Sequence, residues 1–85
     1  MYATMQVKIR YFAALRETAG RSDDTLELPA GATVANAREQ MAATHPALAR
    51  LLPVCAVAVN RAYVAADATL TEGDELVFIP PLGGG

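Results

Sequence analysis

The residues best suited to chemistry stand at the carboxyl end of the chain, in the stretch Pro80–Gly85 with the sequence PPLGGG. Each proline fixes φ at about −65° and lacks an amide N–H, so the pair stops the strand before it. Glycines lose the most conformational entropy on ordering and bury no side chain, so we expect residues 81–85 to form a flexible tail. A carboxylate on Gly85 has no Cβ beside it and can be approached from either side in a narrow channel. This pattern indicates acyl chemistry that another protein performs on the end of the tail.

Length and composition limit what the rest of the chain can be. Its 85 residues suffice for one domain with one core, and 53% of them are apolar, which excludes intrinsic disorder. The net charge is −2 and no basic stripe with interleaved aromatic residues occurs, so no nucleic-acid partner is expected. No apolar stretch approaches the roughly 20 residues of a membrane span, and Met1–Lys8 has no signal-peptide block. We therefore expect a cytoplasmic protein without a membrane partner.

Side chains inside the domain offer little for catalysis or metal binding. Cys55 is the only cysteine, which rules out a disulfide framework and any four-thiolate zinc or iron–sulfur site, and therefore a ferredoxin. Because Cys55 stands in an apolar run, we interpret it as a small core residue. His45 is interpreted as a favourable partner of a helix dipole, and Arg16 with Glu17 as a surface pair. No bound metal or cofactor is expected.

The first third of the chain predicts two strands separated by a short helix. Residues 5–12 alternate between faces, although the otherwise polar face ends in Phe12. The inward positions are Met5, Val7, Ile9 and Tyr11. Residues 13–20 contain helix formers around Leu15 and end in Gly20, a typical left-handed stop. Residues 24–28 alternate again, with Leu26 and Leu28 inward, and Pro29 ends that strand.

The remainder predicts one main helix and three further strands. Thr33 is a good N-cap for a helix that runs to about Thr44, and the His45–Pro46 pair closes it. Residues 47–52 can form one more turn, and the apolar run 54–59 predicts a strand buried on both sides. A tight turn at residues 60–61 leads to a short strand at 62–64, and Leu70 anchors the connection that follows. The last strand, residues 75–80, has no polar face.

This order of elements predicts an α+β fold with one helix packed on one face of a mixed sheet of about five strands. That is the plan of the β-grasp, or ubiquitin-like, fold. We assign residues 1–80 to this domain and residues 81–85 to the tail.

Several segments in this order resemble the small, sulfur-carrier subunit family of molybdopterin synthase, which is related to other ubiquitin-like sulfur carriers. Phe12–Glu17 with Gly20 is similar to the family's Phe-Ala-x-hydrophobic-Arg-Glu segment, and residues 57–60 are similar to its central strand and turn. Gly73–Glu75, Pro80–Pro81 and the final Gly84–Gly85 resemble its closing motif and reactive end. The sequence departs from the family in having a third glycine, Gly83, and in residues 2–4, which lengthen the start.

The resemblance implies a non-catalytic sulfur-donor subunit in a heterotetrameric enzyme complex. A ubiquitin-activating-type adenylyltransferase would use ATP to adenylate the carboxylate of Gly85, and a sulfur donor protein would convert the adenylate to a thiocarboxylate. The tail, from Pro81 and Leu82 through Gly83 and Gly84, would then enter the large subunit of the synthase and give sulfur to cyclic pyranopterin monophosphate. At about 3.3–3.6 Å per residue, residues 81–85 reach roughly 17 Å.

The fold that the resemblance implies also predicts where the apolar residues on the solvent side of the strands lie. If the first and last strands are neighbours, Phe12, Val77 and Ile79 meet on the sheet face away from the helix, and Tyr63 extends them. We call these four residues the apolar patch and predict that the patch docks on the partner. Asp74 and Glu75 are predicted to lie at its rim and to pair with Arg or Lys of the partner.

Three other functions share some of these features. A ubiquitin-like protein modifier would have the same fold, tail and activation but would be joined to lysines of target proteins. A sulfur carrier for thiazole synthesis or tRNA thiolation would have the same terminus and another acceptor. A plain interaction module would have an inert tail.

Overall fold

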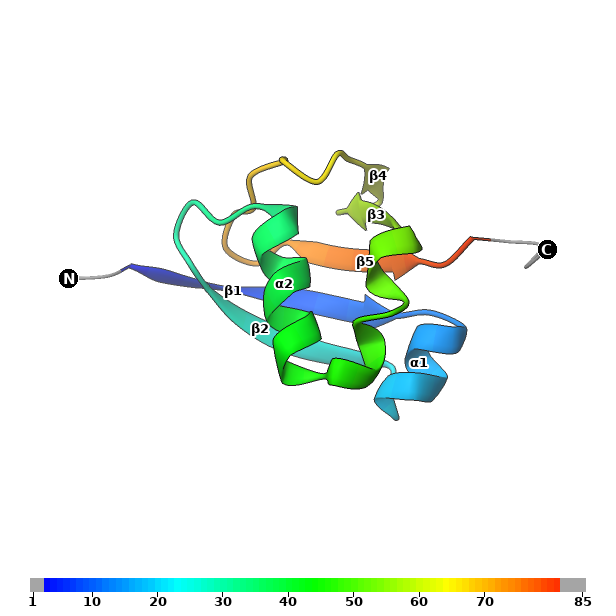
Figure 1. Ribbon diagram of the computed structural model, residues 1–85. Helices are drawn as coiled ribbons and strands as arrows, with labels where there is room; N and C mark the ends of the chain where they lie inside the picture. Colours follow the sequence, from blue (N-terminus) through cyan, green and yellow to red (C-terminus); the bar gives the residue numbers. More distant parts are fainter. Residues whose placement is uncertain (1–2, 82–85) are drawn as a thin grey trace.

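The computed structural model describes residues 3–81, which form a five-stranded sheet with the longer helix across one face (Figure 1). The strands are β1 (Thr4–Tyr11), β2 (Asp23–Pro29), β3 (Ala56–Val59), β4 (Ala62–Tyr63) and β5 (Glu75–Ile79). The helices are α1 (Ala14–Ala19) and α2 (Val34–Thr44), followed by two short 3₁₀ helices, η1 (Pro46–Leu48) and η2 (Leu52–Val54). The sheet and the single crossing helix are those of the ubiquitin-like β-grasp fold, as the sequence predicted.

The sheet has the strand order β2-β1-β5-β3-β4, so the first and last strands lie together at its centre. β1 pairs antiparallel with β2 and parallel with β5, while β3 pairs antiparallel with both β5 and β4. The parallel pair is possible because the chain between β1 and β5 contains a long connection that includes α2. The neighbouring first and last strands that the fold prediction required are therefore confirmed.

The core lies between the sheet and α2. Its side chains come from the predicted inward positions of every long strand, from α1, and from the buried face of the main helix. The largest completely buried residues include Ile9, Leu15, Leu28, Met41, Leu76 and Phe78. Burying a Leu, Ile or Phe side chain contributes about 1.5–3 kcal/mol, so these residues supply much of the driving force for folding.

The ends of the helices follow from local chemistry. Thr33 caps α2: its hydroxyl oxygen accepts from the Asn36 N–H at 3.3 Å, and the Asn36 side chain accepts from the Thr33 N–H at 2.9 Å. This is a reciprocal capping box with asparagine at the third helical position. Gly20 ends α1 with φ of 76°, the left-handed conformation expected there.

The region before β3 differs from the prediction. The predicted turn within residues 47–52 is present as η1, which begins one residue earlier, but a second 3₁₀ turn, η2, follows it and the strand begins at Ala56 instead of Val54. Pro53 has no amide N–H to give to a strand and instead occupies the first turn of η2, which leaves Val54 61% exposed. Ala56 is exposed as well, so the prediction of a strand buried on both sides along its whole length was wrong.

Candidate functional site

The apolar patch lies on the sheet face opposite α2. Val77 of β5 sits between Arg10 of β1 and Ala58 of β3, and Ala58 is paired in turn with Tyr63 of β4. Ile79 is paired with Ala56, and Phe12 directly follows β1 at the same end of the sheet. Tyr63 is 74% and Phe12 58% exposed, whereas Val77 and Ile79 are half-buried. The structure thus brings the four residues to one face.

The chain leaves β5 at the same end of the sheet as Phe12, because β5 runs parallel to β1. β5 ends at Ile79, Pro80 is half-buried, and Pro81 is exposed where the description of the chain ends (Figure 1). The predicted site residues Leu82, Gly83, Gly84 and Gly85 lie outside the described residues. The apolar patch is therefore next to the root of the segment that carries the predicted reactive carboxylate.

Asp74 does not lie at the rim of the apolar patch, where the sequence placed it. Its side chain is buried, with only 8% of the residue exposed, and both carboxylate oxygens accept hydrogen bonds from the same domain. Oδ1 accepts from Asn60 Nδ2 at 2.8 Å and from Thr71 Oγ1 at 3.1 Å, while Oδ2 accepts from the Thr71 N–H at 2.8 Å. Asp74 thus joins the β3–β4 turn to the start of β5, and its burial leaves little of the carboxylate for a partner to contact.

The pKa of Asp74 is lowered from its ordinary value. Burial by itself raises it, but the hydrogen bonds from the Thr71 amide, the Asn60 side chain and the Thr71 hydroxyl together outweigh burial. The group is consequently a carboxylate at neutral pH, as its three donors require.

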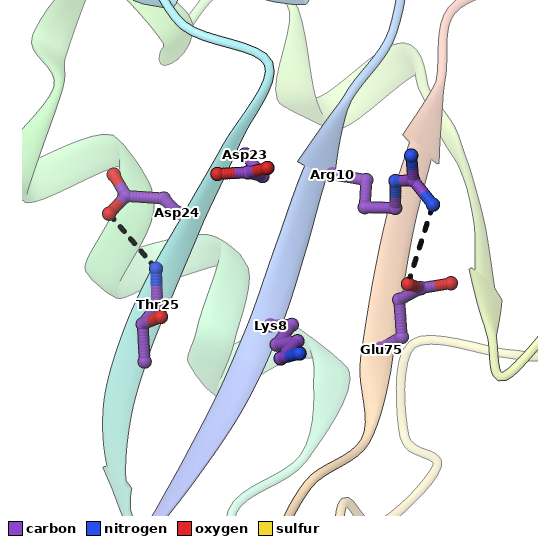
Figure 2. Close-up of a pocket in the computed structure, with 6 residues that line it drawn as sticks. All are labelled: Lys8, Arg10, Asp23, Asp24, Thr25 and Glu75. Atoms are coloured by element: carbon purple, nitrogen blue, oxygen red, sulfur yellow. Dashed lines mark hydrogen bonds and ion pairs between the residues drawn. The ribbon is translucent and has the colours of Figure 1, made fainter.

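Glu75 keeps a surface position on the outer face of the sheet. Its carboxylate forms an ion pair with Arg10 at 3.7 Å, and Lys8 is its register partner on β1 (Figure 2). Asp23 on β2 is the register partner of Arg10, so charges of both signs alternate across β2, β1 and β5 beyond the apolar patch. The backbone of Glu75 is fixed by Asn60, which accepts from its N–H at 3.0 Å and donates to its C=O at 2.8 Å.

Two turns beside the patch hold non-glycine residues at positive φ. Asn60 and Arg61 form the predicted tight turn with φ of 50° and 72°, and Ala13, after Phe12, has φ of 49°. Positive φ at both central residues is the primed turn that suits a hairpin and normally takes Asn-Gly. Asn60 therefore predicted the turn from the sequence, whereas the choice of arginine over glycine at position 61 has no explanation in the turn itself.

The remaining reactive side chains take structural positions. Cys55 is half-buried, its thiol donates to the Leu51 C=O at 3.2 Å, and burial raises the pKa of the thiol. His45 is the C-cap of α2 and lies 3.6 Å from Asp24, while Arg16 and Glu17 form no ion pair within residues 3–81. Across that same range, no three His, Cys, Asp or Glu side chains gather as metal ligands would. Nor does any helix there have the length and apolar character to cross a membrane.

These features define a ubiquitin-like β-grasp domain with an exposed apolar patch beside the end of its last strand. The chain belongs to the ThiS family, whose model matches residues 9–85 and so includes the final glycines.

Known proteins similar to this chain include molybdopterin synthase sulfur carrier subunits and proteins with the ubiquitin-like fold. It is 43% identical to the molybdopterin synthase sulfur carrier subunit of Chlamydomonas reinhardtii, over 95% of this chain and 100% of that protein. The crystal structure of SAMP1 from Haloferax volcanii matches with a TM-score of 0.84 and 30% identity, over 94% of this chain and 99% of the other. A chain in the Helicobacter pylori complex of subunits 1 and 2 of molybdopterin-converting factor matches with a TM-score of 0.67 and 23% identity, over 95% and 100% of the two chains. This last likeness shows a shared fold.

Proposed function

We propose that this chain is the sulfur carrier subunit of molybdopterin synthase. The observation that carries the proposal is the placement of the exposed apolar patch at the root of a glycine-ended tail, in a chain 43% identical to such a subunit. The family match through Gly85 supports a role for the end of the tail.

In the proposed cycle, the carboxylate of Gly85 is the group that changes. A carboxylate oxygen attacks the α-phosphate of ATP on an adenylyltransferase, and pyrophosphate leaves. Sulfur supplied by a donor protein at the oxidation level of sulfide attacks the acyl carbon; the acyl–phosphate bond breaks, AMP leaves, and the terminus becomes a thiocarboxylate. The large subunit of the synthase binds the charged carrier, the thiocarboxylate sulfur bonds to cyclic pyranopterin monophosphate, and water then cleaves the acyl–sulfur bond, which leaves the sulfur on the pterin and restores the carboxylate of Gly85.

The described residues support this cycle by binding partners. The apolar patch gives a partner an area to bury. Val77 is held in register by β1 and β3, and Ile79 by β3, so little order has to be created on binding. Residues 81–85 would span roughly 17 Å from the sheet when extended, enough to enter a partner's active site. Docking and delivery are thereby divided between the rigid sheet and the tail.

Intact mass spectrometry tests the chemistry. After coexpression with an adenylyltransferase and a sulfur donor, the chain is expected to gain the mass difference between one sulfur and one oxygen. A variant with one alanine appended after Gly85 is expected to keep the far-ultraviolet circular dichroism of the parent and to gain nothing. An unchanged mass of the parent chain under these conditions would mean that the tail is inert.

The role of the patch is tested separately by binding to the large subunit. Ile79→Asp places a charge within the patch, at the end of β5, and is expected to abolish binding while the domain stays folded. Ala43→Glu adds the same charge on the exposed side of α2, across the molecule, and serves as the matched control. Retention of binding by Ile79→Asp would remove the patch from the proposal.

A second function has one specific observation in its favour. SAMP1, the small archaeal modifier protein 1 of Haloferax volcanii, matches this chain with a TM-score of 0.84. A protein modifier would use the same fold and the same activation of its terminal carboxylate. The mass experiment separates the two, because a modifier would produce conjugates of higher mass with lysine-bearing proteins. Transfer of sulfur from the charged carrier to the pyranopterin precursor on the large subunit would establish the first function.

A further inference from the structure

A hollow of about 370 Å³ lies beside Phe12, on the outer face of the sheet. Phe12 and Val77, two members of the apolar patch, are among its lining residues, so the hollow is continuous with the surface proposed to dock. Its charged lining consists of three arginines, Arg10, Arg16 and Arg61, against one carboxylate, Glu75. The hollow is therefore positive in a chain whose net charge is −2.

The three arginines are not equivalent. Arg10 forms the ion pair with Glu75 and is thus already matched by the only acidic residue of the lining. Arg16 and Arg61 are exposed and form no ion pair with any residue of the described range 3–81. Two arginines without an ion-pair partner in the described range therefore lie beside the apolar side chains of Phe12 and Val77.

The backbone at Arg61 gives independent evidence that its position serves a purpose. Its φ of 72° is unfavourable for any residue with a Cβ, and glycine is the usual occupant of this turn position. The turn is fixed because Asn60 is bound both to the Asp74 carboxylate and to the Glu75 backbone. Strain that the surroundings hold in place is a feature of functional sites. Here it places an arginine, in preference to glycine, at the edge of the hollow.

We propose that Arg61, together with Arg16, binds a carboxylate of the large subunit and so determines which partner surface the apolar patch accepts. The occupant is an acidic side chain next to an apolar one, with the apolar group seated against Phe12 and Val77. This proposal rests on the proposed function. Charges at the rim of an interface act mainly on the rate and selectivity of association, so Arg61 steers and selects while the patch supplies most of the affinity.

The test is the association rate constant with the purified large subunit, measured at several salt concentrations. Arg61→Gly removes the guanidinium and also relieves the positive φ, so the variant should be at least as stable as the parent. It is expected to associate about threefold to tenfold more slowly at low salt, with a shallower dependence on salt. Arg61→Glu should associate more slowly still. Arg50→Glu reverses an exposed charge between η1 and η2, outside the lining of the hollow, and should stay within about twofold of the parent.

The outcomes separate this inference from the function on which it rests. Binding by the parent, loss of binding by Ile79→Asp, and an unchanged rate and salt dependence for Arg61→Gly would overturn the role of Arg61 alone. Failure of the parent chain to bind the large subunit would overturn both proposals. Self-association of the parent that Arg61→Gly abolishes would also overturn the inference, because the hollow would then receive a second copy of the chain.

Discussion

Replacing Asp74 with asparagine tests the conclusion that this carboxylate fastens two parts of the domain together. Asp74 uses two oxygens to accept three hydrogen bonds, from the Asn60 side chain and from the amide and hydroxyl of Thr71. Asp74→Asn keeps one oxygen and puts an NH₂ group in place of the other. One of the two N–H donors, of Asn60 or of Thr71, must then face another donor.

The expected cost follows from the bond that is lost. A hydrogen bond to a charged group contributes about 1.5–3 kcal/mol, so we expect Asp74→Asn to lower the free energy of unfolding by about 2 kcal/mol. For a domain of this size that corresponds to a fall of roughly 8–16 °C in Tm. The loss is large beside a total stability of about 4–13 kcal/mol for 85 residues.

Urea unfolding at pH 7, followed by far-ultraviolet circular dichroism, measures the loss, and a double variant provides the control. Asn60→Asp combined with Asp74→Asn reverses donor and acceptor in the bond between the two side chains. The new carboxylate can still accept from the Glu75 N–H, as Asn60 does now. The double variant should recover at least about half of the lost stability. Unfolding of Asp74→Asn within about 0.5 kcal/mol of the parent would refute the reasoning, as would a double variant no better than the single one.

The dependence of stability on pH gives a second measure of the same carboxylate. The pKa of Asp74 in the folded chain lies below its ordinary value, because hydrogen bonds from Thr71 and Asn60 outweigh the opposing effect of burial. Its stabilisation is therefore present above about pH 4 and is lost as the pH falls through the lowered pKa. The parent should consequently lose more stability than Asp74→Asn between neutral and strongly acidic pH.

Three further predictions concern the framework around the site. Thr33→Ala removes the oxygen that accepts from the Asn36 N–H at the start of α2 and should cost about 1 kcal/mol in urea unfolding, with little change in m value. Burial, the charge of Asp24 and the hydrogen bond to it raise the pKa of Tyr11 to about 12, so Tyr11→Phe should remove a tyrosinate absorbance step near that pH. The stability that neutral Tyr11 contributes is complete below its ordinary pKa of about 10 and is lost as the pH rises through the folded value. Ala13→Gly relieves a φ of 49° and should raise the free energy of unfolding by up to about 1 kcal/mol; a lower urea midpoint would show that the turn is not strained.

Most of the fold could be predicted from short-range patterns. Alternation over residues 5–12 identified β1 and its buried face, Thr33 marked the first residue before α2, and Gly20 marked the end of α1. Each signal acts over a few residues, through side-chain direction, capping or backbone conformation, so it is visible in a sequence. The wrong prediction that a strand begins at Val54 also comes from a short-range pattern. A run of apolar residues does not distinguish a strand from a 3₁₀ turn, and Pro53 was the one residue that argued against a strand there.

The candidate site depended in part on the sheet order. The apolar patch could be anticipated because Phe12 and Val77 break the polar alternation of their strands, and the pairing of β1 with β5 brings them together. The position of Asp74 could not be anticipated, since an acidic residue after glycine in a turn looks exposed. Its burial results from the β3–β4 turn closing over it, through a hydrogen bond to a residue 14 positions away in the chain.

The sequence by itself determined the glycine run at residues 83–85, the strand and helix periods, and the apolar residues that interrupt the polar faces, because each is a property of neighbouring residues. Only the tertiary structure decided that the Asp74 carboxylate is buried and hydrogen-bonded within the domain. It also decided that Arg61, Phe12 and Arg16 line the same hollow. Phe12 follows β1, Arg16 lies in α1 and Arg61 in the β3–β4 turn, and no local preference connects them. Their meeting is fixed by the order of strands in the sheet, which is set by the burial of the whole core.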